Sequence, residues 1–284
     1  MDLSPRDSPG SLRAEMTTDL TLLRRIDAYL DAAPRTGARA EAIGPCTLFL
    51  NEGHGWRYYA RPTPGASGFT ADVIGTVRAR QRELAQPEAL EWIGEFTPEV
   101  GPAAEATGMH VVDHPLMVLS RDVEVGPTPE GIDVAIVDAD DDLAALSAVA
   151  EVGFATPGTA LGEAGAAEAT AAAARHNPDT IAFQRGRMVA GLTVAAAARV
   201  KGVVAAVGWH QPLEGASEIV GVATLPSFRR RGLGAAVTAA LVADALERGI
   251  DLVFLSADDE DVARVYAKVG FERVGTACAA SAPA

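Results

Sequence analysis

Residues 218–234 read Glu218-Ile219-Val220-Gly221-Val222-Ala223-Thr224-Leu225-Pro226-Ser227-Phe228-Arg229-Arg230-Arg231-Gly232-Leu233-Gly234. The apolar run up to Leu225 predicts a buried strand, which ends at Pro226. A basic turn with two glycines follows, and the apolar residues after Gly234 predict a helix. Successive backbone N–H groups in such a turn and the N-terminus of the helix favour a bound pyrophosphate. The segment therefore predicts a strand–loop–helix unit that holds a phosphorylated ligand.

The turn concentrates positive charge in an acidic protein. Arg229, Arg230 and Arg231 are consecutive, whereas the whole chain has 38 acidic and 24 basic residues and a formal net charge of −14. Gly232 and Gly234 lack the Cβ atoms that would keep phosphates away from the backbone. The glycine spacing alone leaves one alternative open, a solvated basic turn before a core helix.

Two other phosphate-binding patterns do not fit this turn. The sequence lacks the Gly-Lys-Ser/Thr of a P-loop, and Val237 stands where a dinucleotide fingerprint needs a third glycine. A nucleotide-binding enzyme is therefore disfavoured.

Two motifs carry a family resemblance. Arg229-x-x-Gly232-x-Gly234, after the strand that ends in residues 222–226, resembles the acyl-CoA pyrophosphate motif of the GNAT acetyltransferase superfamily. Residues 259–271 resemble the second motif of that superfamily, a helix with a tyrosine, here Tyr266, followed by Gly-Phe and a strand. The order and separation of the two motifs are more specific than either motif alone. The resemblance covers about residues 132–277.

The resemblance implies a cofactor and a place for it. In this superfamily the strands that correspond to residues 218–225 and 250–257 run parallel but splay apart, and the pantetheine arm lies in the gap. It implies acetyl-CoA as co-substrate and no metal. The residues assigned to the cofactor are Val222, Ala223, Thr224, Arg229, Arg230, Arg231, Gly232, Leu233, Gly234 and Asp259. Many relatives have Asn at the last of these positions, and a carboxylate cannot donate the hydrogen bond that an amide donates.

The resemblance also implies a catalytic role for Tyr266. It stands where a phenol protonates the leaving thiolate, although a core tyrosine is the alternative interpretation. Glu218 is the leading candidate for the general base, with a solvent-facing carboxylate as its alternative, and His210 is a second candidate. A backbone N–H near Val222 is expected to bind the oxyanion. Gly221, inside an apolar strand, predicts a bulge that helps to open the gap.

The fold class predicted from these patterns is α/β (α+β), a GNAT fold with a central mixed, partly splayed sheet flanked by helices. We divide the chain into a flexible tail (1–18), a smaller α/β domain (19–122), a linker rich in Pro, Gly and charge (123–131) and the GNAT domain (132–284). The smaller domain ends in a strand–helix–strand order that resembles the closing part of the same fold. Because no Arg-x-x-Gly-x-Gly precedes it, we interpret it as a degenerate tandem copy that has lost cofactor binding.

Composition limits the partners and the location. The chain is 48% hydrophobic and 22% charged, which is typical of globular proteins. Its acidity argues against nucleic-acid or membrane-surface partners, and its N-terminus lacks the apolar region of a secretory signal. Two cysteines, Cys46 and Cys278, suit a reducing cytoplasm. His110, Asp113 and His114 lack a further spaced ligand, so we predict no metal site.

The resulting hypothesis is a cytoplasmic N-acetyltransferase that acts on a small-molecule or peptide amine, with a homodimer left open. The alternative is a non-catalytic acyl-CoA-binding sensor or partner-docking module.

Overall fold

The computed structural model describes residues 12–51, 53, 58–120 and 130–283. In chain order the elements are α1 (Leu12–Ala32), η1 (Pro34–Thr36), β1 (Arg39–Ile43), β2 (Cys46–Leu50), β3 (Ala60–Pro62), α2 (Ala71–Glu83), β4 (Ala89–Ile93), α3 (Val100–Ala106), β5 (His110–Leu119), β6 (Asp133–Val137), α4 (Leu143–Phe154), α5 (Ala166–Ala173), α6 (Pro178–Val189), β7 (Val194–Val200), β8 (Val203–Leu213), β9 (Ala216–Thr224), η2 (Pro226–Phe228), α7 (Leu233–Glu247), β10 (Leu252–Ser256), α8 (Glu260–Ala267) and β11 (Phe271–Ser281).

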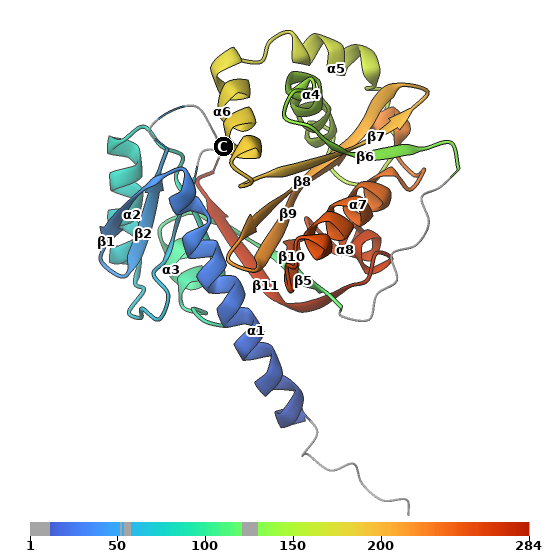
Figure 1. Ribbon diagram of the computed structural model, residues 1–284. Helices are drawn as coiled ribbons and strands as arrows, with labels where there is room; N and C mark the ends of the chain where they lie inside the picture. The colour runs from blue at the N-terminus through green and yellow to red at the C-terminus, as the bar shows by residue number, and fades with distance from the viewer. Residues whose placement is uncertain (1–11, 52, 54–57, 121–129, 284) are drawn as a thin grey trace, which may run out of the picture.

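The strands of the described residues form one 11-stranded sheet in the order β1-β2-β3-β4-β11-β5-β10-β9-β8-β7-β6. The pairs β3–β4 and β9–β10 are parallel, and the other pairs are antiparallel. Helices lie against the sheet (Figure 1). The predicted mixed α/β fold with flanking helices is therefore confirmed.

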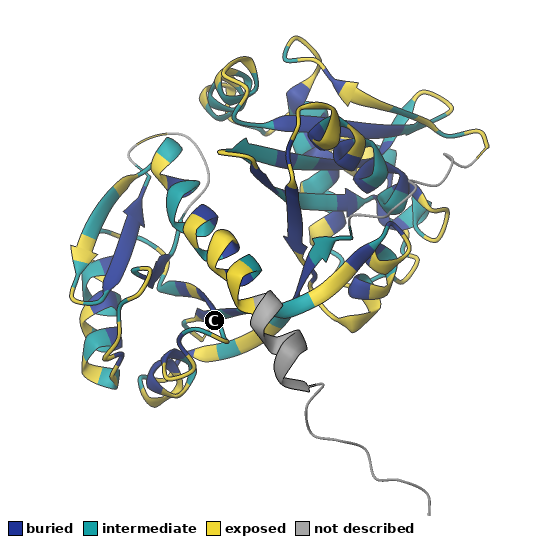
Figure 2. Ribbon diagram, turned by 60° about the horizontal axis from the view of Figure 1, so that its bottom comes forward, coloured by how far each residue is buried: buried dark blue, intermediate teal, exposed yellow. Residues whose placement is uncertain are grey.

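Strand β5 joins the two halves of the chain. It precedes the predicted linker in sequence, yet it lies between β10 and β11 and pairs antiparallel with both. On its other edge β11 pairs with β4 of the first half. The two halves thus share one sheet, and in Figure 2 they form two lobes that the shared strands connect. The limits of the predicted domains stay a prediction, since residues 121–129 of the linker lie outside the described part.

Small side chains allow helices to pack closely on both faces of the second half. Ala195 and Ala197 of β7 belong to the core that contains α4. Ala196 and Ala198, which point to the opposite face, belong to the core that contains α7. The alanine run is thus a strand buried on both sides, as the dark-blue residues of Figure 2 illustrate.

The end of the first half matches the predicted element order. The strand–helix–strand order predicted there is β4, α3 and β5. The elements β1, β2, β3 and α2 precede it, and β3 begins at Ala60. Helix α1 begins at Leu12, inside the stretch that we predict as a tail.

The arginines of α2 are engaged within the protein. Arg78 and Arg82 contact Glu88 at 2.6 and 2.7 Å, and Arg80 contacts Glu41 at 2.7 Å. These contacts hold α2 to its neighbours.

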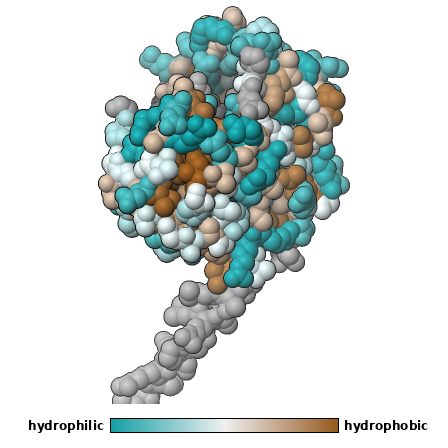
Figure 3. Space-filling view, turned by 90° about the vertical axis from the view of Figure 1, so that its left-hand side faces the viewer, coloured by the Kyte–Doolittle hydropathy of each residue, from teal (hydrophilic) through white to brown (hydrophobic). Residues whose placement is uncertain are grey.

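On the face of the N-terminal half in Figure 3, hydrophobic residues gather in one patch surrounded by hydrophilic ones.

Three further findings, on cysteines, membrane-spanning helices and metal ligands, apply to the residues that the structure describes. Cys46 and Cys278 are free thiols, and both are buried. No described helix has the length and apolar character needed to cross a bilayer. Within the described ranges, no group of three or more His, Cys, Asp and Glu side chains is arranged to hold a metal ion.

Candidate active site

A cavity of about 1030 Å³ opens where β9 and β10 separate. The two strands pair in parallel only from Ala216 to Glu218 and from Leu252 to Phe254. Beyond that point β9 continues to Thr224 and β10 to Ser256 without further pairing to each other. The predicted splay is confirmed, and it leaves the backbone of β9 facing the cavity.

A bulge in β9 contributes to this opening. Gly221 has a φ of 65°, and together with Val222 it stands opposite the single residue Gly208 of β8. A Cβ atom on Gly221 would lie 2.9 Å from Cε3 of Trp209, so the close approach of this ring also requires glycine. The bulge predicted from the glycine is confirmed.

The basic loop closes one end of the cavity. Arg230 and Gly232 have φ values of 59° and 78°, and Gly232 is the N-cap of α7. Both residues line the cavity, as do Leu233 and Gly234, so the first N–H groups of α7 stand at its wall. Arg231 does not line it, because its guanidinium lies over the ring of Phe228 at 5.2 Å.

The Arg229 side chain is engaged within the protein and is not free to bind a phosphate group. Its guanidinium donates hydrogen bonds to the carbonyl oxygens of Gly153 at 2.8 Å, Thr156 at 2.6 Å and Ala160 at 3.1 Å. Nε donates a further bond to the carbonyl of Thr224 at 3.3 Å. Arg229 therefore ties the segment between α4 and α5 to the basic loop. That segment lines the cavity beside the loop.

Tyr266 of α8 lines the cavity from the side opposite β9. It is 9% exposed, and its ring lies edge-on to Phe271 at 6.2 Å. Burial raises the pKa of its phenol to about 12. The phenol therefore stays protonated at neutral pH and can donate a hydrogen bond or a proton into the cavity.

Glu218 lies where β9 and β10 separate. Its backbone N–H donates to the Tyr29 hydroxyl at 3.3 Å, and that hydroxyl donates to the Gln211 carbonyl at 2.6 Å, so α1 fixes this point of β9. Burial and, to a lesser extent, the nearby Glu91 carboxylate raise the pKa of Glu218 to about 8. The ionised form of such a carboxyl is a stronger base than an ordinary carboxylate, and it forms as the pH rises toward 8.

His210 is not part of the cavity. It is completely buried, with Nδ1 at 2.8 Å from Ser217 Oγ and Nε2 at 2.9 Å from Asp244 Oδ2. Burial lowers the pKa of its imidazole. Because both ring nitrogens are engaged inside the fold, His210 is a structural residue, and our second candidate for the base is wrong.

Comparisons with known proteins agree with this geometry. Residues 197–279 match the family model described as FR47-like protein. A GCN5-related N-acetyltransferase from Kribbella flavida is 24% identical, with 92% of this chain and 95% of that chain covered and a TM-score of 0.65. The chain has the GNAT fold. The resemblance seen in the sequence is thereby confirmed.

Other solved GNAT structures align over nearly the whole chain. A tandem GNAT protein from the clavulanic acid biosynthesis pathway is 16% identical, covers 95% of this chain and 97% of its own, and gives a TM-score of 0.53. A GCN5-related N-acetyltransferase-like protein from Streptococcus suis 89/1591 is 15% identical, with 92% and 98% covered and a TM-score of 0.54. Because both alignments extend over the two halves, the tandem interpretation fits the fold. None of the curated proteins matches this chain significantly.

Within this GNAT fold Asp259 takes a structural position. Its carboxylate accepts a hydrogen bond from the Val262 N–H at 2.8 Å and caps α8. The neighbouring Asp258 and Asp261 line the cavity, whereas Asp259 does not. Its assignment to the cofactor is therefore replaced by a capping role, in which the side-chain oxygen accepts a backbone hydrogen bond.

All the other residues assigned to the cofactor, except Arg231, line the cavity, as do Glu218 and Tyr266. Residues of the first half that were not predicted to belong to the site line the same space: Tyr59, Arg61, Glu91, Trp92 and His114. No local motif marks them. They reach the cavity because β4 and β5 flank β11 in the shared sheet.

Proposed function

We propose that this chain is an N-acetyltransferase that moves an acetyl group from acetyl-CoA to an amine by direct transfer in a ternary complex. The observation that carries the proposal is the gap between β9 and β10. It begins at Glu218 and ends at the glycine-containing loop, and Tyr266 faces it. We further propose a cytoplasmic location and a small-molecule or peptide acceptor.

The residues present suit acetyl-CoA. The unpaired backbone of β9 around Val222 and Thr224 can bond the pantetheine amides as an added strand would. The N–H groups at Gly232 and Gly234, at the positive end of α7, suit the pyrophosphate. The cavity of about 1030 Å³ is at the upper end of the usual range for ligand sites, as a large cofactor requires.

The proposed reaction uses two side chains and one backbone group. The amine nitrogen attacks the thioester carbonyl carbon, so that a C–N bond forms while the C–S bond breaks. The Glu218 carboxylate accepts the proton that the nitrogen loses, and the Tyr266 phenol supplies the proton that the sulfur gains. A backbone N–H at the bulge near Val222 stabilises the negative charge on the carbonyl oxygen.

One observation favours the second candidate function, a non-catalytic acyl-CoA-binding module. Arg229, the first residue of the motif, uses its donors on backbone carbonyls. Release of free thiol from acetyl-CoA, followed across a panel of primary amines, distinguishes the two functions. Amine-dependent release supports the enzyme. Binding of acetyl-CoA without any release supports the sensor.

The cofactor site has its own test. We expect Gly232→Glu to weaken acetyl-CoA binding by at least about tenfold in calorimetry, because a carboxylate then stands at the proposed phosphate position. Gly44→Glu is the matched control: Gly44 also has a positive φ, 57°, but lies in the turn between β1 and β2 with open space around it. Unchanged affinity in the first variant would contradict the assignment.

A further inference from the structure

The cavity continues beyond the splay into the first half of the chain. Phe254 and Glu218 lie at the junction, and Arg61, Glu91 and Trp92 line its far part. Since the glycine-containing loop bounds the opposite end, the far part is where an acceptor would meet the thioester under the proposed function. The inference below rests on that function.

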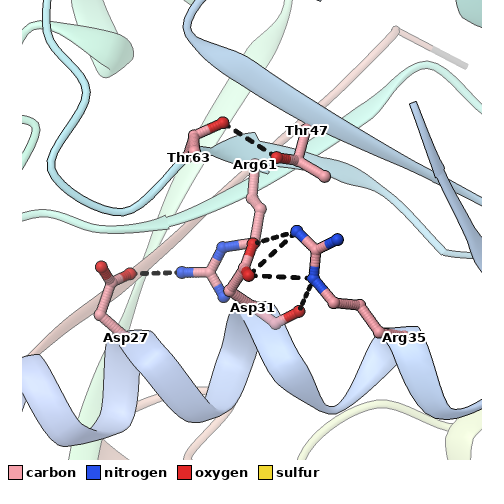
Figure 4. A network of polar contacts seen from close by, with 6 residues as sticks. All are labelled: Asp27, Asp31, Arg35, Thr47, Arg61 and Thr63. Atoms are coloured by element: carbon pink, nitrogen blue, oxygen red, sulfur yellow. Dashed lines mark hydrogen bonds and ion pairs between the residues drawn. The ribbon is translucent and has the colours of Figure 1, made fainter. Parts of the chain in front are cut away.

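Arg61 lies inside this far part with most of its donors unused. It is 1% exposed, and one nitrogen donates to Asp27 Oδ1 at 2.5 Å. Figure 4 shows the side chain extending from β3 toward α1, where it meets Asp27. Its Nε and Nη1 atoms are buried and have no hydrogen-bond partner. Unsatisfied donors are rare in a protein interior, and those of Arg61 require an acceptor atom, so they do not themselves contribute to the binding of a cation.

Three carboxylates share this one guanidinium. Arg61 pairs with Asp27, and its positive charge also acts on Glu91 and Glu218. The Asp27–Arg61 pair is neutral, so Glu91 and Glu218 remain without a full counter-charge. Glu91 is nevertheless exposed to the cavity, and Glu218 is half-buried, so a ligand can reach both.

Groups from several elements face this carboxylate pair. Tyr29 of α1 lies near Glu218, and the Tyr59 phenol forms a hydrogen bond with the Glu91 carboxyl. Arg61 of β3 acts on both carboxyl groups. His114 comes from β5, and its Nδ1 lies 2.9 Å from the Asp258 carbonyl. Arg61 and His114 are the basic side chains among them. The pair can relieve its repulsion by taking up a proton or a cation.

The balance of charges around Glu91 and Glu218 favours a bound cation. Burial raises the pKa of Glu91 to about 7, and burial together with the Glu91 charge raises the pKa of Glu218 to about 8. A cation bound between the two carboxyl groups would stabilise their ionised forms. We propose that a cationic primary amine without an adjacent carboxylate binds between Glu218 of the second half and Glu91 of the first half. Glu91 would pair with the ammonium, and the Glu218 carboxylate would take a proton from the nitrogen, whose lone pair then attacks the thioester. The first half thus supplies the acceptor subsite.

The test compares Glu91→Gln with Glu99→Gln, an exposed carboxylate outside this cavity. The probes are 1,4-diaminobutane and 4-aminobutanoate, which differ by a carboxylate in place of an ammonium group. We expect the wild-type protein to acetylate the diamine in preference. Glu91→Gln should raise the KM for the diamine about tenfold and leave the KM for acetyl-CoA unchanged. Glu91→Asp should restore part of the loss, and Glu99→Gln should have no effect.

A pH profile adds a readout that a merely structural role would not change. Removing the Glu91 charge lowers the pKa of Glu218, so the acidic limb of kcat/KM should move to lower pH in Glu91→Gln. An unchanged limb, an unchanged KM for the diamine, or equal use of 4-aminobutanoate would each overturn the inference. Calorimetry with acetyl-CoA distinguishes failure of the proposed function from failure of the acceptor subsite. If acetyl-CoA does not bind, the proposed function is refuted. If acetyl-CoA binds and Glu91→Gln has no effect on the diamine, only the acceptor subsite is refuted.

Discussion

Replacing Glu218 by Gln should change how the stability of the protein depends on pH. In the folded protein burial and Glu91 raise the pKa of Glu218 from an ordinary 4.5 to about 8. This increase corresponds to at most about 5 kcal/mol, at 1.36 kcal/mol for each pKa unit. Solvent in the cavity screens a half-buried carboxyl, so we expect about 2–4 kcal/mol.

The sign follows from proton binding. Between pH 4.5 and 8 the folded protein keeps the Glu218 proton and the unfolded chain has lost it, so the wild-type protein loses stability as the pH rises. Gln has no proton to lose and is similar in shape. The free energy of unfolding of Glu218→Gln, relative to wild type, should therefore increase by about 2–4 kcal/mol between pH 5 and pH 9.

Urea unfolding at pH 5, 6, 7, 8 and 9 measures this difference. Glu272→Gln, at an exposed position of β11, is the matched control and should give a constant difference over the same range. A constant difference for Glu218→Gln as well would refute the reasoning, because it would mean that the carboxyl is ionised in the folded protein throughout. Glu218 could then not titrate as a base near neutral pH.

Three more substitutions test other parts of the site. Tyr266→Phe should lower kcat at least about 100-fold while the KM for acetyl-CoA stays the same, and an equal rate would exclude the phenol from the reaction. Arg229→Lys should speed chymotrypsin cleavage after the exposed Phe154, because one ammonium group cannot bind three separated carbonyl oxygens. Unchanged cleavage would show that Arg229 does not fix the segment between α4 and α5. Gly221→Ala should lower the free energy of unfolding by about 1–3 kcal/mol in urea, whereas Gly75→Ala, in open space on α2, should not; a neutral effect at 221 would contradict the bulge.

The parts of the fold that the sequence predicted are those fixed by neighbouring residues. The strand, the basic loop and the helix between Glu218 and Glu247 follow from hydrophobic pattern, Pro226 and two glycines, all within one segment. The bulge at Gly221 was predictable for the same reason, since only a residue without a Cβ atom tolerates its φ and the Trp209 ring beside it.

Other features were not predictable because their causes lie elsewhere in the chain. Arg229 and Asp259 stand at motif positions, yet one binds carbonyls of the α4–α5 connection and the other caps its own helix. Helix α6 has no buried residue, so it lacks the apolar stripe that marks a helix in sequence. A residue type at a motif position thus predicts the backbone better than it predicts the partner of the side chain.

The position of β5 in the sheet explains why the sequence did not predict the part of the cavity that the first half lines. Its pairings with β10 and β11 join residues 136 to 171 positions apart, from Phe254↔Val118 to Ser281↔His110, and no local pattern determines such a register. This pairing brings His114 to the cavity, and the next pairing, β11 with β4, brings Glu91. The first half lacks the glycine motif, but the shared sheet makes its strands part of the site. Under the proposed function the first half is therefore part of the active site and not only a scaffold.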